Sequence, residues 1–154
     1  MAKNHQPYIG VVGAGKCSKK MKEQAECIGM AIAERGGILV CGGLGGVMEA
    51  AARGAKKKKG LTVGILPGST KEDANQYIDI AIPTGFGEAR NLVLIKTADA
   101  IIALPGKYGT LSEMAFCMKL GKPIVSLQAW NISDEIERFE DPLEAVSRAF
   151  ELAR

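Results

Sequence analysis

Short apolar segments alternate along the chain with longer segments in which apolar residues recur at helical spacing. The apolar segments predict β-strands over residues 8–12, 38–41, 61–66, 78–82, 100–104 and 123–127. The intervening spacing predicts helices over residues 18–35, 47–58, 86–97 and 110–120, and a last helix from Pro142 to the end. Because continuously apolar strands that alternate with helices form parallel sheets, the pattern predicts an α/β fold: a doubly wound, mostly parallel sheet with helices on both faces.

Glycine-rich loops follow the first, second and fifth predicted strands. They contain Gly13 and Gly15, the run from Gly42 to Gly46, and the stretch from Pro105 to Gly109. Ligands of doubly wound sheets bind beyond the carboxyl ends of the strands, so we expect the binding site at these loops. The polar segment between Leu66 and Tyr77 is rich in turn-forming residues, and we expect it to form one wall of the cleft.

The composition fits a single domain over residues 1–154 with a frayed N-terminus at residues 1–7. Apolar residues make up 47% of the chain and charged residues 24%, as in ordinary globular proteins. A chain of 154 residues buries a substantial core without disulfides or metals to support it. Its 19 glycines are more than such a domain needs, which indicates that loops use them.

Charge and cysteine content exclude several classes of partner. The net charge of +3 suits small anionic ligands but is too low for a nucleic-acid-binding surface. No apolar run approaches the roughly 20 residues that cross a bilayer, so we expect no membrane partner. The cysteines form no C-x-x-C pair and have only His5 to join them, which predicts reduced thiols in a cytoplasm and no metal site.

The first glycine loop comes close to two nucleotide-binding motifs and satisfies neither. The stretch from Gly10 to Cys17 follows G-x-x-x-x-G-K-[ST] except that Cys17 cannot offer magnesium a hydroxyl, which argues against ATP or GTP hydrolysis. The second strand ends at Cys41 and glycine instead of the acidic residue that holds the ribose of NAD. We expect Gly13 and Gly15 to let a ligand approach the backbone, or simply to allow a tight turn.

The second loop places Gly42, Gly43, Gly45 and Gly46 immediately before a predicted helix. Backbone N–H groups at such a helix start bind anions without a charged side chain. Alternatively, the glycines let the strand and the helix pack closely. The sequence does not separate these two interpretations.

The third loop offers a phosphate site and a competing explanation. Pro105 and Gly106 end a strand, Gly109 is expected to take a positive φ, and Thr110 lies where an N-cap would, so the free N–H groups behind it suit a phosphate. However, Thr110 and Glu113 also match the capping box, in which the glutamate bonds back to the N-cap amide. Both interpretations stay open.

Several motifs together resemble the LONELY GUY (LOG) superfamily of Rossmann-like proteins. They are GGLGGVME at residues 42–49, GEARN at 87–91, ADAIIALPG at 98–106 and PGKYGTLSE at 105–113, the last similar to the superfamily's P-G-G-x-G-T-x-x-E signature. The resemblance covers residues 9–127. It implies a Rossmann-like sheet, a homodimer or larger homo-oligomer, and a pocket for a nucleoside 5′-monophosphate.

The characterised enzymes of the superfamily are phosphoribohydrolases, which release the base of a nucleoside 5′-monophosphate and leave ribose 5-phosphate. The resemblance implies that Arg90 and Glu113 are catalytic, with Glu113 beside the positively charged sugar of the transition state and Arg90 assisting the departing base. Arg90 could instead be a surface cation or a bidentate partner of Glu113. The residues expected to bind phosphate or nucleotide are Gly13, Gly15, Gly42, Gly43, Gly45, Gly46, Met48, Gly106, Lys107, Tyr108, Gly109 and Thr110.

Two departures from the LOG pattern favour a different branch of the superfamily. Lys107 replaces the second glycine of P-G-G, and Asn91 stands where LOG enzymes usually have lysine. The chain is similar in this respect to a small branch that includes molybdenum cofactor carrier proteins, which bind a phosphorylated pterin without hydrolysing it. We therefore expect no required cofactor, and either a nucleoside monophosphate or molybdopterin as the bound ligand. A lysine decarboxylase label, once used in the superfamily, is rejected because nothing in the sequence builds a pyridoxal phosphate site.

Overall fold

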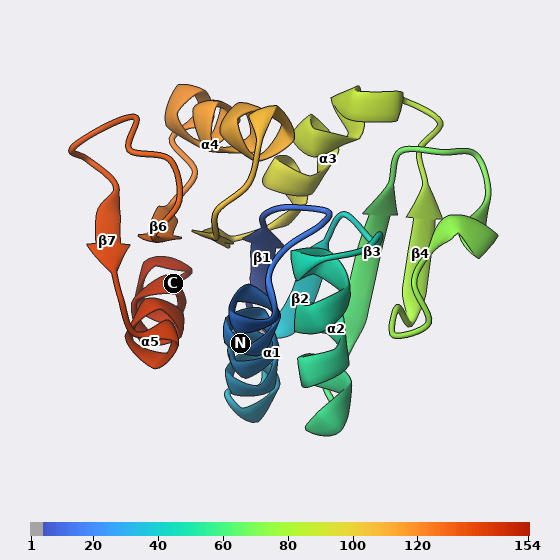
Figure 1. Cartoon of the computed structure of the whole chain (residues 1–154), viewed down its shortest axis with the longest axis horizontal. Coiled ribbons are helices and arrows are strands. Elements are labelled where there is room, and N and C mark those ends of the chain that lie inside the picture. Colours follow the sequence, from blue (N-terminus) through green and yellow to red (C-terminus); the bar gives the residue numbers. More distant parts are fainter. Residues whose placement is uncertain (1–4) are drawn as a thin grey trace.

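One seven-stranded sheet runs through the computed structural model, which describes residues 5–154 (Figure 1). The strand order is β4-β3-β2-β1-β5-β6-β7, and every neighbouring pair is parallel. The strands are β1 (Tyr8–Val12), β2 (Ile38–Cys41), β3 (Thr62–Leu66), β4 (Ile80–Pro83), β5 (Ala100–Ala103), β6 (Ile124–Leu127) and β7 (Glu137–Phe139). The predicted α/β, Rossmann-like fold is confirmed, and the sheet is wholly parallel.

Helices cover both faces of the sheet (Figure 1). One face carries α1 (Lys19–Glu34), α2 (Val47–Lys57) and α5 (Pro142–Leu152), and the other carries α3 (Arg90–Thr97) and α4 (Tyr108–Leu120). Side chains of the central strands alternate between two apolar clusters, as the period of a strand requires. Val11 packs in the cluster with α1, α2 and α5, whereas Val12 packs with Leu94 of α3 and Met114 of α4.

The order of the strands creates a crevice beside β1. The chain moves outward from β1 through β2 and β3 to β4, then crosses to β5 on the opposite side of β1. The loops that leave β1 and β5 therefore lead to helices on opposite faces of the sheet. Such a switch point is where doubly wound folds bind ligands, and it lies between the first and third glycine loops.

Local sequence signals explain where two of the helices begin. Ser18 is the N-cap of α1, and its hydroxyl accepts a hydrogen bond from the Met21 N–H at 3.2 Å. Asp141 caps α5 in the same way through the Leu143 N–H at 3.0 Å, with Pro142 in the first turn. These caps fix the ends of two helices that form the large apolar cluster on one face.

The structure differs from the sequence prediction at several elements. β4 spans Ile80–Pro83 instead of residues 78–82. The edge strand β7 was not predicted, because its residues are polar and largely exposed. Helix α3 starts at Arg90 and is preceded by a short 3₁₀ helix, Gly87–Ala89, instead of beginning at residue 86. Helix α4 starts at Tyr108, two residues before the predicted Thr110. The expected frayed terminus, residues 1–7, lies partly outside the described residues.

Within residues 5–154, no helix has the length and apolar character needed to cross a membrane.

Candidate functional site

The glycine loops after β1, β2 and β5 meet at the carboxyl edge of the sheet and are joined by backbone hydrogen bonds. The Ala14 N–H donates to the Pro105 carbonyl at 3.0 Å, and the Val47 N–H donates to the Ala14 carbonyl at 2.9 Å. Ala14 thus connects the start of α2 to the loop before α4. These hydrogen bonds hold three loops that are distant in sequence together at one edge of the sheet.

Two of the loop glycines permit this close approach and do not line the cavity. Gly46 has a φ of +63°, and a Cβ there would lie 2.3 Å from the Ala14 carbonyl oxygen. A Cβ on Gly106 would lie 2.0 Å from the Thr110 hydroxyl oxygen and 3.1 Å from the Ala14 nitrogen. For these two positions the close-packing interpretation accounts for the glycine.

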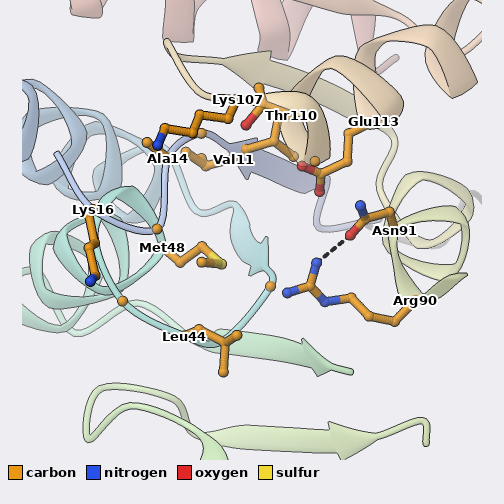
Figure 2. A pocket seen from close by; sticks show the side chains of 16 residues that line it. Val11, Ala14, Lys16, Leu44, Met48, Arg90, Asn91, Lys107, Thr110 and Glu113 are labelled. Atoms are coloured by element: carbon orange, nitrogen blue, oxygen red, sulfur yellow. Dashed lines mark hydrogen bonds between the residues drawn. The ribbon is translucent and has the colours of Figure 1, made fainter. Parts of the chain in front are cut away.

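The loops and the starts of α3 and α4 enclose a cavity of ≈ 500 Å³ (Figure 2). Ten of the residues predicted for the site line it: Gly13, Gly15, Gly42, Gly45, Met48, Arg90, Lys107, Gly109, Thr110 and Glu113. Four predicted residues do not: Gly43, Gly46, Gly106 and Tyr108. The lining also includes Val11, Val12, Ala14, Lys16, Leu44 and Asn91, which the sequence had not placed there.

The polar segment between Leu66 and Tyr77 does not line this cavity, contrary to our expectation. It supports the second glycine loop instead. The Asn75 backbone N–H donates to the Gly43 carbonyl at 2.9 Å, and its side-chain amide donates to the Leu44 carbonyl at 2.8 Å. The segment therefore supports the loop that carries Leu44, which lines the cavity.

The capping box predicted for Thr110 and Glu113 is not formed. The N-cap of α4 is Lys107, which places Thr110 inside the first turn and Glu113 in the second, too far along the helix to reach the N-cap amide. Gly109 is also helical and does not take the positive φ that we expected. No side chain of residues 5–154 caps this helix, so its first N–H groups are free to meet an anion.

Glu113 is a buried carboxyl group that faces the cavity (Figure 2). It is only 7% exposed, and none of the hydrogen bonds described for residues 5–154 involves its side chain. Burial disfavours the charged form and raises the pKa of Glu113 to about 7, although the positive charge of Arg90 opposes the shift. Near neutral pH this group exists in both protonation states and can donate or accept a hydrogen bond.

Arg90 enters the same cavity from the first residue of α3 (Figure 2). Burial lowers its pKa, and the neighbouring Glu113 and Cys41 act in the opposite direction. Its terminal nitrogen Nη1 donates to the Asn91 side-chain carbonyl, while its Nε is buried without a hydrogen-bond partner. Arg90 is thus neither a surface cation nor, in the described structure, a bidentate partner of Glu113.

Asn91 connects Arg90 to the start of α4. It is 4% exposed, and its amide nitrogen donates to the Ser112 hydroxyl at 3.2 Å. That hydroxyl donates in turn to the Gly109 carbonyl at 2.6 Å. The sequence singled out Asn91 only as a departure from the LOG pattern. The sequence signal for its contact with Arg90 was a polar residue directly after that arginine.

Two lysines complete the electrostatics of the site. The side chains of Lys16 and Lys107 are solvent-exposed and lie at the mouth of the cavity. They add positive charge around the cavity, whose lining also includes Arg90 and the uncharged Leu44 and Met48. This arrangement suits a ligand with an anionic group and a less polar body. Within residues 5–154, no group of His, Cys, Asp and Glu side chains could hold a metal ion.

Comparison with known proteins gives a family match over nearly the whole chain. Residues 6–152 match the SLOG cluster4 family. An uncharacterized protein of Archaeoglobus fulgidus is 47% identical over 139 residues, which are 90% of this chain and 91% of that protein. A cytokinin riboside 5′-monophosphate phosphoribohydrolase of Mycobacterium tuberculosis is 37% identical over 125 residues, 75% of this chain and 66% of the enzyme.

Two solved structures of similar proteins align with this chain over almost its whole length and almost the whole of theirs. The molybdenum cofactor binding protein of Rippkaea orientalis is 33% identical with a TM-score of 0.92, over 99% of this chain and 100% of that protein. The molybdenum cofactor carrier protein of Chlamydomonas reinhardtii is 31% identical with a TM-score of 0.86, over 96% of this chain and 98% of the carrier.

Proposed function

Since the chain belongs to the SLOG cluster4 family, a LOG-like group with molybdenum cofactor carriers among its structural neighbours, we propose that its cavity binds a small phosphorylated ligand. The observation that carries the proposal is the unused bonding capacity of Arg90 and Glu113, which line the same cavity as the uncapped start of α4. The Nε of Arg90 is buried without a hydrogen-bond partner, and no hydrogen bond described for residues 5–154 involves the Glu113 carboxyl. A buried polar atom without a partner is unfavourable. A ligand that bonds to it would remove that cost.

The phosphate of the ligand would sit at the start of α4. The N–H groups of the first turn point toward it, the positive end of the helix dipole attracts it, and Lys107 and Lys16 supply positive charge nearby. The volume of ≈ 500 Å³ is within the range of roughly 300–1,000 Å³ typical of small-molecule sites. The cavity therefore has room for both a phosphate and a bicyclic ring.

A phosphorylated pterin, as in the molybdenum cofactor, is the ligand that we favour. The similarity to the molybdenum cofactor binding protein extends over both complete chains, whereas that to the phosphoribohydrolase covers about two thirds of the enzyme. The edge of a pterin ring carries adjacent donors and acceptors. A carboxyl group with a pKa of about 7 can match such an edge in either protonation state. In this role the protein binds or carries its ligand without changing it.

Hydrolysis of a nucleoside 5′-monophosphate is the second candidate, and the placement of Arg90 and Glu113 favours it. Breaking the N-glycosidic bond leaves positive charge on the ribose, which ionised Glu113 would stabilise, while Arg90 would assist the departing base. Water would then add to the sugar to give ribose 5-phosphate. Because Glu113 must be ionised for this role, the rate would rise as the pH passes about 7.

Isothermal titration calorimetry with 6-hydroxymethylpterin phosphate tests the pterin proposal, with unphosphorylated 6-hydroxymethylpterin as the matched control. We expect the phosphate to improve affinity at least tenfold, as charged hydrogen bonds typically do. Equal affinity for the two pterins would reject the proposed phosphate site.

Incubation with AMP or a cytokinin riboside monophosphate, followed by chromatography of the free base, tests the hydrolysis candidate. Base release that disappears in Glu113→Gln would support an enzyme. Binding of these nucleotides without base release, at pH 8 where Glu113 is mostly ionised, would reject hydrolysis and leave ligand binding as the proposed function.

We also infer from the chain length that residues 1–154 form one domain, and from the cysteine content that the protein is cytoplasmic. We infer further that it assembles as a homodimer or larger homo-oligomer, as the LOG resemblance implies. Sedimentation velocity tests the assembly. A monomer at micromolar concentration would contradict it.

A further inference from the structure

The single tryptophan of the chain forms an aromatic stack beside the candidate site. The rings of Trp130 and Tyr108 are stacked with centroids 6.3 Å apart and an interplanar angle of 20°. Tyr108 is 79% exposed and Trp130 is 39% exposed. Aromatic residues make up only 5% of the chain, so two large exposed rings in contact are unusual for this sequence. The open rings can accept a further planar group.

This stack is attached to the loop that starts α4. The indole N–H of Trp130 donates to the Lys107 carbonyl at 3.1 Å, and Lys107 is the N-cap of α4. The hydrogen bond fixes the indole ring relative to the helix start. A preorganised ring loses little conformational entropy when a ligand stacks on it.

A second hollow of ≈ 350 Å³ borders Trp130. Its walls are Pro105 and Gly106 of the loop before α4 and residues 128–131 of the segment after β6. The main cavity is lined by the next residues of that loop and by the first turn of α4, including Lys107 and Thr110. The loop that leads into α4 therefore borders both hollows: Pro105 and Gly106 line the one beside Trp130, and Lys107 lines the one that contains Glu113.

We propose that the Trp130–Tyr108 stack and its hollow form a second subsite, which binds a planar heteroaromatic group joined to the phosphate by a second ester or a diphosphate linkage. The proposal rests on the proposed function for the position of the phosphate. A phosphate between the hollows can carry one substituent toward Glu113 and another toward Trp130. The complete site then accepts a dinucleotide-type ligand, in which two ring systems flank the phosphate.

The second subsite has the features that recognise a heterocycle. Base stacking on an aromatic side chain strengthens binding by about tenfold to a hundredfold. The exposed side chains of Gln128 and Asn131 offer amide donors and acceptors for the edge of the ring. Gln128 has a φ of +60°, in the left-handed region that non-glycine residues seldom adopt, so the structure holds this residue in a defined position at the rim.

Fluorescence of the single tryptophan gives a direct test, because every signal from indole comes from Trp130. The probes are AMP, with one base and one phosphate, and diadenosine diphosphate, with two adenosines joined through a diphosphate. We expect diadenosine diphosphate to quench Trp130 strongly and to bind at least about tenfold more tightly than AMP, which should change the emission little.

Tyr108→Ala is the variant that isolates the stack, because Tyr108 is largely exposed and does not line the main cavity. We expect it to weaken diadenosine diphosphate about tenfold more than it weakens AMP, measured by calorimetry. Trp130→Phe serves as a second variant, which retains a ring for stacking but loses the bond to Lys107. Its loss of affinity for the dinucleotide should be smaller than that of a double variant that carries both Tyr108→Ala and Trp130→Ala.

Binding of AMP with no advantage for diadenosine diphosphate would overturn the second subsite and leave the proposed function standing. Equal weakening of both nucleotides by Tyr108→Ala would also overturn it. A change of Trp130 emission that follows protein concentration instead of ligand would assign the stack to a contact between copies of the chain. Failure of AMP, diadenosine diphosphate and the phosphorylated pterin to bind at all would reject the proposed function and the subsite together.

Discussion

The guanidinium of Arg90 and the carboxyl group of Glu113 face one cavity from neighbouring helices, and no hydrogen bond or ion pair joins them. Each keeps unused bonding capacity. Glu113 has no hydrogen-bond partner among residues 5–154, and the Nε of Arg90 is buried without one. Among residues 5–154, Glu113 is the only buried acidic or basic side chain, and together with Arg90 it marks a site prepared for a ligand.

Replacing Glu113 by glutamine should stabilise the protein at alkaline pH. Burial raises the pKa of Glu113 from 4.5 to about 7 in the folded state, so the wild type loses stability as the pH rises through that range. Glu113→Gln avoids this loss, which amounts to about 3 kcal/mol of unfolding free energy at pH 8. The advantage should vanish below about pH 4.5. Urea denaturation across this range measures it.

Glu26→Gln is the control, because its effect on stability at alkaline pH should have the opposite sign. Lys57 and Arg53 bond to Glu26 and lower its pKa, so its contribution to stability is present above the unfolded-state pKa and is lost as the pH falls. Glu26→Gln should therefore be less stable than the wild type at pH 8. A Glu113→Gln protein that behaves like Glu26→Gln would contradict the unpaired state of Glu113.

Replacing Arg90 by methionine should raise the pKa of Glu113 further, because the positive charge of Arg90 is what opposes the effect of burial. We also expect affinity for a phosphorylated ligand to fall about tenfold to a hundredfold through loss of charged hydrogen bonds. Carbon-13 NMR of the glutamate carboxyl groups measures the pKa. Arg53→Met, which removes a cation that bonds to Glu26 away from the cavity, should alter neither quantity.

Alanine at two neighbouring glycines should have opposite effects on stability. Gly106→Ala places a Cβ 2.0 Å from the Thr110 hydroxyl oxygen and should cost about 1–3 kcal/mol of unfolding free energy. Gly109 lies in the first turn of α4 with open space around its Cβ position, so Gly109→Ala should gain about 0.5–1 kcal/mol. Thermal denaturation measures both. A similar loss in both variants would mean that α4 does not begin at Tyr108.

Replacing Lys107 by methionine should weaken phosphate binding and make it less dependent on salt, because the side chain adds positive charge at the mouth of the cavity. We expect a loss of about threefold to tenfold in calorimetry at low ionic strength. Lys71→Met, at an exposed lysine outside the lining, is the matched control. Equal effects of the two variants would indicate a general charge effect instead of a local contact.

The fold could be predicted from sequence because the strands are continuously apolar. β1 and β2 were placed at their exact bounds, since Tyr8–Val12 and Ile38–Cys41 are flanked by clear turn signals. β7 escaped prediction because an edge strand with polar, exposed residues leaves no apolar pattern. The start of α4 was misplaced because a capping motif at Thr110 and Glu113 suggested a helix start that the backbone does not use.

The site could be predicted in outline and not in detail. The glycine loops mark the carboxyl edge, but which glycines line the cavity depends on contacts between loops, such as that of Gly46 with Ala14. Sequence also cannot tell whether Arg90 bonds to Glu113 or to Asn91, because both lie within reach of a flexible side chain. The bond to Asn91 and the unpaired state of Glu113 came only from the three-dimensional arrangement.

A mass-spectrometric inventory of small molecules that copurify with the folded protein tests the central claim most directly. The wild type should retain a phosphorylated compound with a planar ring, a pterin or a nucleotide, and Arg90→Met should lose it while Arg53→Met keeps it. Retention of a ligand without a phosphate, or the same inventory in all three proteins, would contradict the proposal that this cavity binds a phosphorylated ligand.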